Sequence, residues 1–199
     1  MVARFFSADR VQAGRHWLGG CLLAVACAAG LAQDSITELA PERRARLQWE
    51  VGYVLHQLGE YERAIEAYRA SIADHPTAEA HTFLGWSLSH LGRIEEAITQ
   101  CRIAIQLDPD FGNPYNDIGV YLLNAGKADE AIPWLEKAIA ARRYCCYQFP
   151  HYNLGRVLLA QGKLEEARRS FERAVEIDPG YVPALVALEL IRRGGLQGL

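Results

Sequence analysis

Apolar side chains recur at helical spacing in two consecutive segments that are separated by a glycine. In the first such pair they are Val51, Val54, Leu55 and Leu58 before Gly59, and Tyr61, Ala64, Ile65, Tyr68 and Ile72 after it. Residues three and four positions apart share one face of an α-helix, so each segment predicts a helix with an apolar face. Glycine readily adopts the left-handed conformation that ends many helices. The pattern therefore predicts a helix, a tight turn at Gly59 and a second helix.

This pattern occurs four times in register. A first glycine stands at Gly52, Gly85, Gly119 and Gly155, at spacings of 33, 34 and 36 residues. Seven residues later come Gly59, Gly92, Gly126 and Gly162, and five residues after these come Ala64, Ala97, Ala131 and Ala167. Pro76, Pro109 and Pro179 close three of the copies, because proline interrupts a helix. The chain is thus predicted to consist of repeated helix–turn–helix units.

Each predicted unit is too thin to bury its own apolar faces, so neighbouring units must cover one another. The first glycine and the alanine lie where the two helices of a unit would cross, and small side chains there let the backbones approach. We predict an all-α fold, a helix–turn–helix repeat solenoid of four repeats with a C-terminal capping helix. The expected boundaries are 34–44 for a linker and helix start, 45–77, 78–111, 112–147 and 148–181 for the repeats, and 182–199 for the capping helix and tail.

The units resemble tetratricopeptide repeats, a family with a period of 34 residues. The resemblance covers residues 45–179 and rests on the Leu–Gly pairs at Gly85 and Gly155 and on the repeated alanines and prolines. At Gly52 and Gly119 the residue before the glycine is valine or isoleucine, which matches the family pattern less closely. In this family the first helices of successive units line a concave groove that holds an extended peptide or a partner helix. The resemblance therefore implies a non-enzymatic protein-interaction adaptor or scaffold.

Transferred position by position, the family's groove would contain side chains from the first helix of every unit. The candidates are Trp49, Tyr53, His56, Trp86, His90, Asn116, Asn124, Tyr152 and Arg156. Rigid aromatic rings suit interface anchors, although rings on a helix face also serve as packing residues. Asn116, Asn124 and Arg156 could hold a peptide backbone or a carboxylate. Some family members grip a C-terminal carboxylate with groove lysines, which these positions lack, so an extended peptide with apolar side chains is the expected ligand.

The charge of the chain argues against nucleic acid as a partner, because 21 basic and 24 acidic residues give a net charge of -3 without a long basic run.

Near the start, Arg4, Arg10 and Arg15 precede an uncharged apolar stretch, residues 17–32. This stretch is shorter than the roughly 20 residues that cross a bilayer, and the pattern is typical of a secretory signal peptide over residues 1–33. We therefore expect an exported protein, periplasmic or secreted, with anchoring in a membrane by a retained N-terminal segment as the alternative.

The segment RRYCCYQFPHYNLG, residues 142–155, departs from the repeat pattern. Zinc sites usually separate two cysteines by two to four residues, and we expect Cys145 and Cys146 to point to opposite sides of an extended loop. A catalytic thiol would need a base held by a third group. We predict no metal, cofactor, catalytic residue or small-molecule substrate, and interpret the segment as a lengthened loop packed by its rings. A structural subunit of a cell-envelope assembly and a Cys/His metal or redox protein are the alternatives to the adaptor.

Overall fold

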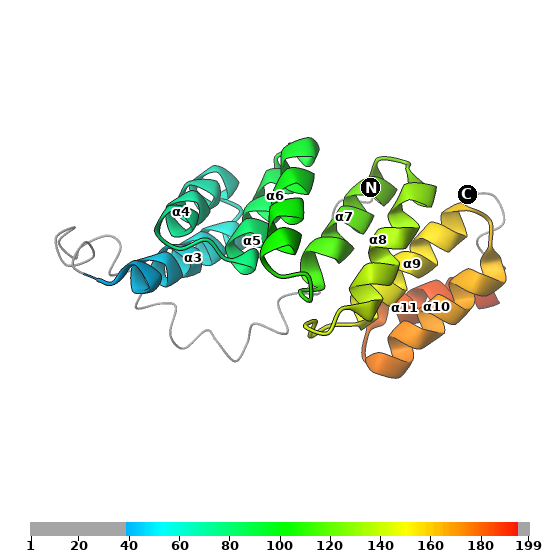
Figure 1. Cartoon of the computed structure of the whole chain (residues 1–199). Helices are drawn as coiled ribbons and strands as arrows, with labels where there is room; N and C mark the ends of the chain where they lie inside the picture. Colours follow the sequence, from blue (N-terminus) through cyan, green and yellow to red (C-terminus); the bar gives the residue numbers. More distant parts are fainter. Residues whose placement is uncertain (1–38, 195–199) are drawn as a thin grey trace. The chain divides into compact units, whose positions relative to one another are not determined.

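The computed structural model describes residues 39–194. That part of the chain contains nine α-helices, α3 to α11, and no strand (Figure 1). The helices belong to two compact units, one with the residues up to Pro76 and one with the residues from Thr77 onward. The predicted class, an all-α helical repeat solenoid, is confirmed.

The first unit is a pair of helices, α3 (Pro41–Gln57) and α4 (Tyr61–Asp74). Pro41 opens α3, where its missing N–H removes no intrahelical hydrogen bond. Gly52 faces the ring of Tyr68 so closely that an added Cβ would lie 2.7 Å from Tyr68 Cε1. An ion pair of 2.6 Å between Arg44 Nη2 and Asp74 Oδ1 links the first turns of α3 to the end of α4. Close packing and one cross-helix ion pair therefore hold this unit together.

The second unit contains three helix pairs and a last single helix. The pairs are α5 (Ala78–His90) with α6 (Ile94–Leu107), α7 (Asn113–Asn124) with α8 (Ala128–Ala140), and α9 (Gln148–Ala160) with α10 (Leu164–Ile177), and α11 (Val182–Arg192) follows. The second helix of a pair also contacts the first helix of the next pair. In addition, α7 contacts both α5 and α9. The first helices of these repeats thus form one layer, which is the layer that the sequence predicts to carry the groove.

Small residues lie where the two helices of a pair cross. The repeated alanines Ala64, Ala97, Ala131 and Ala167 have no exposed surface. A Cβ on Gly119 would lie 2.6 Å from Leu135 Cδ2, and a Cβ on Gly155 would lie 2.6 Å from Phe171 Cε1. Carbon atoms in good contact stay 3.5–4.0 Å apart, so only glycine allows the observed approach. The role predicted for the first glycine of each unit is confirmed.

The turn glycines have the backbone conformation that their position predicts. The angle φ is +79° at Gly59, +75° at Gly92 and Gly126, and +73° at Gly162. A Cβ at any of these four positions would meet nothing within 4 Å. The backbone angle therefore selects glycine at the turns, whereas lack of space selects it at the helix crossings.

The lengthened segment between α8 and α9 is tied to the loop of the preceding repeat. The Arg143 N–H donates to the Asp110 carbonyl at 2.9 Å, and the Gly112 N–H donates to the Arg143 carbonyl at 3.0 Å. The Arg143 guanidinium forms ion pairs of 2.6 Å with Glu79 and with Asp108. This basic residue therefore joins the start of α5 and the loop after α6 to the start of the irregular segment.

The prediction for the adjacent cysteines is wrong. We expected their side chains to point to opposite sides, but the structure pairs Cys145 and Cys146 as a vicinal disulfide. The chain bends at Cys145 and turns into α9 from Tyr147 onward, so the backbone is not extended at this point. The Tyr147 hydroxyl donates to the Ala141 carbonyl at 2.6 Å, and its ring meets that of Tyr144 edge-on with centroids 5.5 Å apart. The aromatic packing expected for this loop is present.

The last helix, α11, covers one side of the fourth repeat. Ala184 is completely buried, and it belongs to a hydrophobic cluster with Phe171, Ala174 and Tyr181. Gly194, with φ of +67°, follows the helix in the left-handed conformation that ends many helices. Four apolar side chains of α11 stay exposed, namely Val182, Leu185, Val186 and Leu190.

Among the helices of residues 39–194, none combines the length and the apolar character that a bilayer crossing requires. The predicted signal peptide, residues 1–33, lies outside the described residues.

Candidate functional site

Three predicted groove residues belong to the first unit. Trp49 and Tyr53 lie one turn apart on α3, and their rings stack with centroids 5.7 Å apart. Both are half-buried. His56 is 4% exposed, and its ring meets Tyr61 of α4 edge-on at 5.2 Å. Trp49 and Tyr53 therefore keep part of their surface accessible, whereas His56 packs inside the helix pair.

In the second unit, α5 carries the next two candidates. The rings of Trp86 and His90 lie one turn apart, with centroids 5.8 Å apart, and Phe83 approaches Trp86 at 5.7 Å. Trp86 is half-buried and His90 is exposed. Amphipathic rings of this kind offer an apolar surface together with a polar edge. This part of α5 is thus an accessible aromatic surface on the layer of first helices.

A chain of polar side chains joins α7 to α9. Asn153 Nδ2 donates to Asn116 Oδ1 at 2.9 Å, and Arg156 Nη1 donates to Asn153 Oδ1 at 3.1 Å. Arg156 Nη2 also reaches Asn124 Oδ1 at 3.5 Å. Asn116 and Asn153 are buried, where an unsatisfied polar group would cost about 1–3 kcal/mol. The structure therefore brings the predicted residues Asn116, Asn124 and Arg156 together.

The sequence analysis did not identify Asn153, whose side chain connects the hydrogen-bonded polar side chains of α7 and α9. Asn153 stands two residues before Gly155, and Asp117 occupies the same position of the preceding repeat. Both side chains are buried, although repeated helices usually place apolar residues inside. A polar residue at the same position in two successive repeats is the signal that could have found it. Asn116 is only 3% exposed, and its side chain accepts a hydrogen bond from Asn153, which in turn accepts one from Arg156. Asn116 therefore helps to fix the positions of Asn153 and Arg156.

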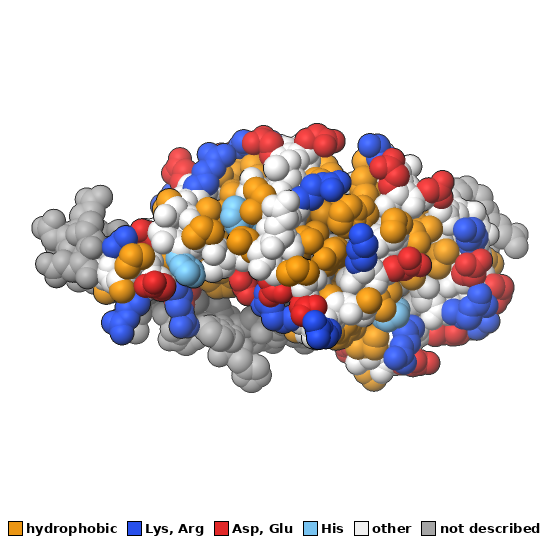
Figure 2. Space-filling view, viewed as in Figure 1, with side chains coloured by type: hydrophobic (Ala, Val, Ile, Leu, Met, Phe, Trp, Pro, Cys, Tyr) orange, Lys and Arg blue, Asp and Glu red, His pale blue; other side chains and the backbone are white. Residues whose placement is uncertain are grey.

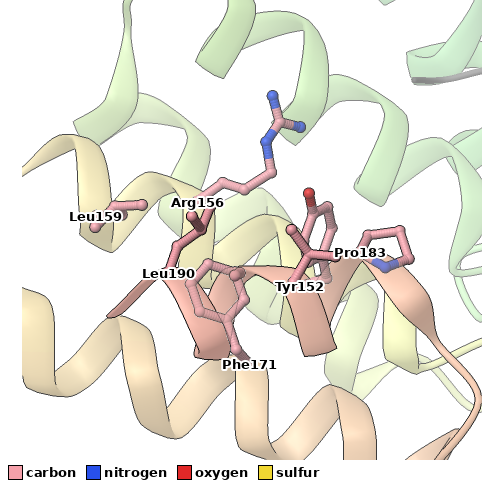
Figure 3. Close-up of a pocket in the computed structure, with 8 residues that line it drawn as sticks. Tyr152, Arg156, Leu159, Phe171, Pro183 and Leu190 are labelled. Carbon is pink, nitrogen blue, oxygen red and sulfur yellow. The ribbon is translucent and has the colours of Figure 1, made fainter. Parts of the chain in front are cut away.

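A small cavity lies beside Arg156 (Figure 3). Its volume is about 190 Å³, and it is lined by Tyr152, Arg156 and Leu159 of α9, Phe171 of α10, and Pro183, Val186, Ala187 and Leu190 of α11. The Tyr152 hydroxyl and the Arg156 guanidinium extend to the same side of α9 (Figure 3). The ring of Tyr152 meets that of Tyr181 edge-on at 5.4 Å, and Arg156 Cζ lies 6.0 Å from the Tyr152 centroid. The cavity thus has apolar walls with a polar and cationic rim.

Burial shifts the pKa of one side chain of this site, Arg156, and that of Cys101 on α6. Burial lowers the pKa of Arg156, yet a guanidinium stays charged at neutral pH, so the site holds a partly desolvated positive charge. Burial raises the pKa of the fully buried Cys101 thiol, which keeps it protonated and unreactive. Basic and acidic side chains are interspersed over the face drawn in Figure 2. The arrangement can hold a partner through hydrogen bonds, one charge and apolar contacts.

The sequence matches family models described as tetratricopeptide repeat over residues 24–79, 52–110, 115–143 and 149–181. The chain belongs to the tetratricopeptide repeat family. Proteins of this family are generally non-enzymatic scaffolds, and their repeat domains bind protein or peptide partners.

Individual relatives are similar to parts of the chain. DnaJ homolog subfamily C member 3 of Mus musculus is 33% identical over 101 residues, which are 51% of this chain and 20% of that protein. The chain thus matches about a fifth of this curated relative. The structure of pilF of Pseudomonas aeruginosa has a TM-score of 0.68 at 22% identity and covers 78% of each chain. The first tetratricopeptide repeat domain of Spaghetti (RPAP3), bound to the HSP90 peptide SRMEEVD, has a TM-score of 0.54 at 24% identity and covers 59% of this chain and 92% of its own. Both structures share the fold.

Proposed function

We propose that this protein is a non-enzymatic adaptor that binds a segment of a protein partner along α5, α7 and α9. The observation that carries the proposal is the polar chain from Asn116 through Asn153 to Arg156, which ends beside an apolar cavity. A polypeptide segment offers backbone amides, side-chain charges and apolar groups, and this surface has a complement for each. The repeat scaffold places these groups on packed helices, which reduces the entropy that binding must overcome.

The aromatic side chains of the same layer support this proposal. Trp86 and Tyr152 are half-buried, so part of each ring is exposed. Contacts with neighbouring aromatic rings hold the rest of each side chain in place. Tryptophan, tyrosine and arginine are the residues that most often dominate binding energy at protein interfaces. A structure that shares the fold, the Spaghetti domain, binds a peptide of HSP90.

A test of the proposal compares aromatic substitutions on first and second helices. Trp86→Ala and Tyr152→Ala remove rings from the layer of first helices, and Trp134→Ala removes a half-buried ring from α8 as the matched control. In a crosslinking pull-down from the native host, we expect the first two variants to lose the partner and the control to keep it. Circular dichroism establishes that each variant is folded. An unchanged set of captured proteins with all three folded variants would contradict the proposal.

We also propose that the protein is exported. The basis is the sequence of residues 1–33, with its basic start, short apolar stretch and small residues near the end. N-terminal sequencing of material from outside the cytoplasm tests this proposal directly. Cleavage near residue 33 is the expected result, and an intact Met1 would contradict it.

A second candidate function, a structural subunit of a larger assembly, is favoured by α11. Val182 and Leu185 are 61% and 40% exposed on a helix that otherwise packs on the fourth repeat. Neither residue lines the cavity beside Arg156. If this function holds, Val182→Ser with Leu185→Ser should release the protein from a large complex in size-exclusion chromatography, whereas Trp86→Ala should not. The reverse result would favour the adaptor.

A further inference from the structure

We propose that the vicinal disulfide of Cys145 and Cys146 is a reversible redox site, and that its state sets how firmly the first turn of α9 is held. A dithiol reductant opens the disulfide by attack on Cys145, and an external disulfide closes it again. Both cysteines precede α9, so neither belongs to the helices along which we propose that the partner binds. The site therefore operates without a partner.

The disulfide does little to cross-link the fold. A disulfide stabilises a protein mainly by closing a loop of the unfolded chain, and the effect grows with the length of that loop. Cys145 and Cys146 are neighbours with Cα atoms 3.8 Å apart, so their loop contains a single peptide bond. The helix pairs are held by close packing instead, as at Gly119 and Gly155. The chemistry of the two sulfur atoms is therefore what the pair adds to the protein.

One cysteine of the pair is more accessible than the other. Cys145 is exposed, whereas Cys146 is half-buried. The two preceding arginines, Arg142 and Arg143, form ion pairs with carboxylates, so their charges are balanced and do not select a sulfur atom. The rate at which a thiolate attacks a disulfide depends on access to the sulfur. Access therefore makes Cys145 the residue that a reductant attacks.

The exchange proceeds in two steps. A thiolate of the reductant attacks Sγ of Cys145 and forms a mixed disulfide, while the bond to Cys146 breaks and Cys146 leaves as a thiolate that takes a proton from water. The second thiolate of the reductant then attacks the reductant's own sulfur in the mixed disulfide. This step releases the oxidised reductant and leaves Cys145 as a thiolate, which also takes a proton. Two electrons pass from the reductant to the protein, and an external disulfide reverses both steps.

The pair adjoins the first turn of α9. The Phe149 N–H in that turn donates to the Cys146 carbonyl at 3.0 Å. A ring closed through one peptide bond removes backbone freedom from Cys146 and so fixes the direction of this carbonyl. Phe149 in turn meets the ring of Tyr181 edge-on, with centroids 5.5 Å apart. Opening the disulfide should therefore weaken this hydrogen bond at the start of α9.

Contacts on both sides of the pair confine the change to a few residues. Before the pair, Tyr144 packs on Gly112 so closely that an added Cβ would lie 2.7 Å from Tyr144 Cγ. After the pair, the Tyr147 hydroxyl donates to the Ala141 carbonyl at 2.6 Å. Neither contact involves a sulfur atom, so both should persist in the reduced protein. Reduction should thus act on the start of α9 and leave the fold intact.

The first experiment identifies the attacked sulfur in the full chain. The protein is incubated under native conditions with reduced glutathione, a monothiol that performs the first step, and is then quenched with acid and digested. Tandem mass spectrometry should find glutathione several-fold more often on Cys145 than on Cys146. The matched variants Cys146→Ser and Cys145→Ser each keep one thiol of the pair. A bulky maleimide should label Cys146→Ser several-fold faster than Cys145→Ser.

Hydrogen exchange measures the effect on α9. Reduction with dithiothreitol should speed exchange of the Phe149 amide about two- to tenfold, the range for the loss of one hydrogen bond. The Ala167 amide, which donates to the Lys163 carbonyl in the first turn of α10, is the internal control and should not change. The double variant Cys145→Ser with Cys146→Ser should show the fast rate with and without dithiothreitol. Circular dichroism before and after reduction establishes that the helices persist.

Reoxidation with oxidised glutathione should restore slow exchange at Phe149, and a change that cannot be reversed would overturn the inference. Glutathione attached equally to both cysteines would also overturn it, and so would a disulfide that both reagents leave intact in the folded protein. An exchange rate that reduction does not alter has the same consequence. Free thiols at both positions in protein isolated without reductant would show that the pair is not a redox site.

Discussion

Replacing Gly155 by alanine should destabilise the fourth repeat, although alanine is the better helix former. A Cβ at this position would lie 2.6, 2.7 and 3.0 Å from three ring atoms of Phe171. Because carbon atoms in good contact are about 3.6 Å apart, the ring would have to withdraw by roughly 1 Å. Phe171 is 1% exposed and packs in a cluster with Leu158, Ala174 and Ala184, so it cannot withdraw without displacing its neighbours.

The magnitude follows from two opposing effects. Adding a methyl group to a well-packed core costs about 1–3 kcal/mol, and replacing glycine by alanine inside a helix returns about 1 kcal/mol. The net change in the free energy of unfolding for Gly155→Ala is then a loss of about 0–2 kcal/mol. Since 1 kcal/mol corresponds to roughly 2–4 °C for a chain of this size, we expect the melting temperature to fall by a few degrees.

Thermal unfolding followed by circular dichroism measures this effect, with Gly85→Ala as the matched control. At Gly85 the nearest atoms to an added Cβ are the Ala97 carbonyl oxygen at 3.0 Å and Cys101 Sγ at 3.4 Å. The clash there is smaller, so the gain in helix propensity offsets more of it. We therefore expect Gly85→Ala to melt at a higher temperature than Gly155→Ala.

A double-mutant cycle can refute the reasoning. Phe171→Cys places at this crossing the residue type that faces Gly85, and it removes the ring that the new methyl group would strike. In this background Gly155→Ala should lower the melting temperature less than in the native chain, because the clash with the ring is gone and the gain in helix propensity remains. The two sites should therefore couple by about 1–3 kcal/mol. If Gly155→Ala has the same effect in both backgrounds, Phe171 does not set the requirement for glycine.

Three other predictions concern separate parts of the chain. Asn153→Ala should lower the free energy of unfolding by about 1–3 kcal/mol in urea titrations, because it leaves buried amide groups unsatisfied; a loss near zero would contradict the network. In a tryptic digest without reductant, the peptide with Cys145 and Cys146 should be lighter by two hydrogen atoms and resist alkylation, and free thiols would contradict the pairing. The hydrogen bond from Arg44 lowers the pKa of Asp74 despite opposing desolvation, so their interaction stabilises the fold above the ordinary carboxyl pKa and is lost as the pH falls through the lowered one. An NMR titration should show a higher Asp74 pKa in Arg44→Gln, and an unchanged value would refute the assignment.

The helix pairs could be predicted because their determinants lie close together in the sequence and recur. The turn at Gly126 depends on one backbone angle, and the crossing at Gly119 on one missing side chain. Both requirements appear four times in register, so chance composition is no explanation. The side chains that face the first glycines differ from repeat to repeat, from Tyr68 through Cys101 to Phe171, and their exact fit could not be predicted from the period alone.

The candidate site was only partly predictable, because its decisive contacts join distant residues. The hydrogen bond between Asn153 and Asn116 spans 37 residues, and hydrophobic periodicity contains no information about such a pair. The cavity beside Arg156 depends on how α11 lies against α9 and α10, which the repeat pattern does not describe. The prediction for Cys145 and Cys146 was wrong because their geometry depends on a bend in an irregular loop, where no periodic rule applies.

The two ion pairs of Arg143 make one edge of the second unit sensitive to salt. They join Arg143 to Glu79, which lies 64 residues earlier in the chain, and to Asp108, which lies 35 residues earlier. All three side chains are partly exposed, with relative accessibilities of 32–46%, so dissolved ions weaken these attractions. We therefore expect added salt to weaken the connection between the start of α5, the loop after α6 and the segment after α8.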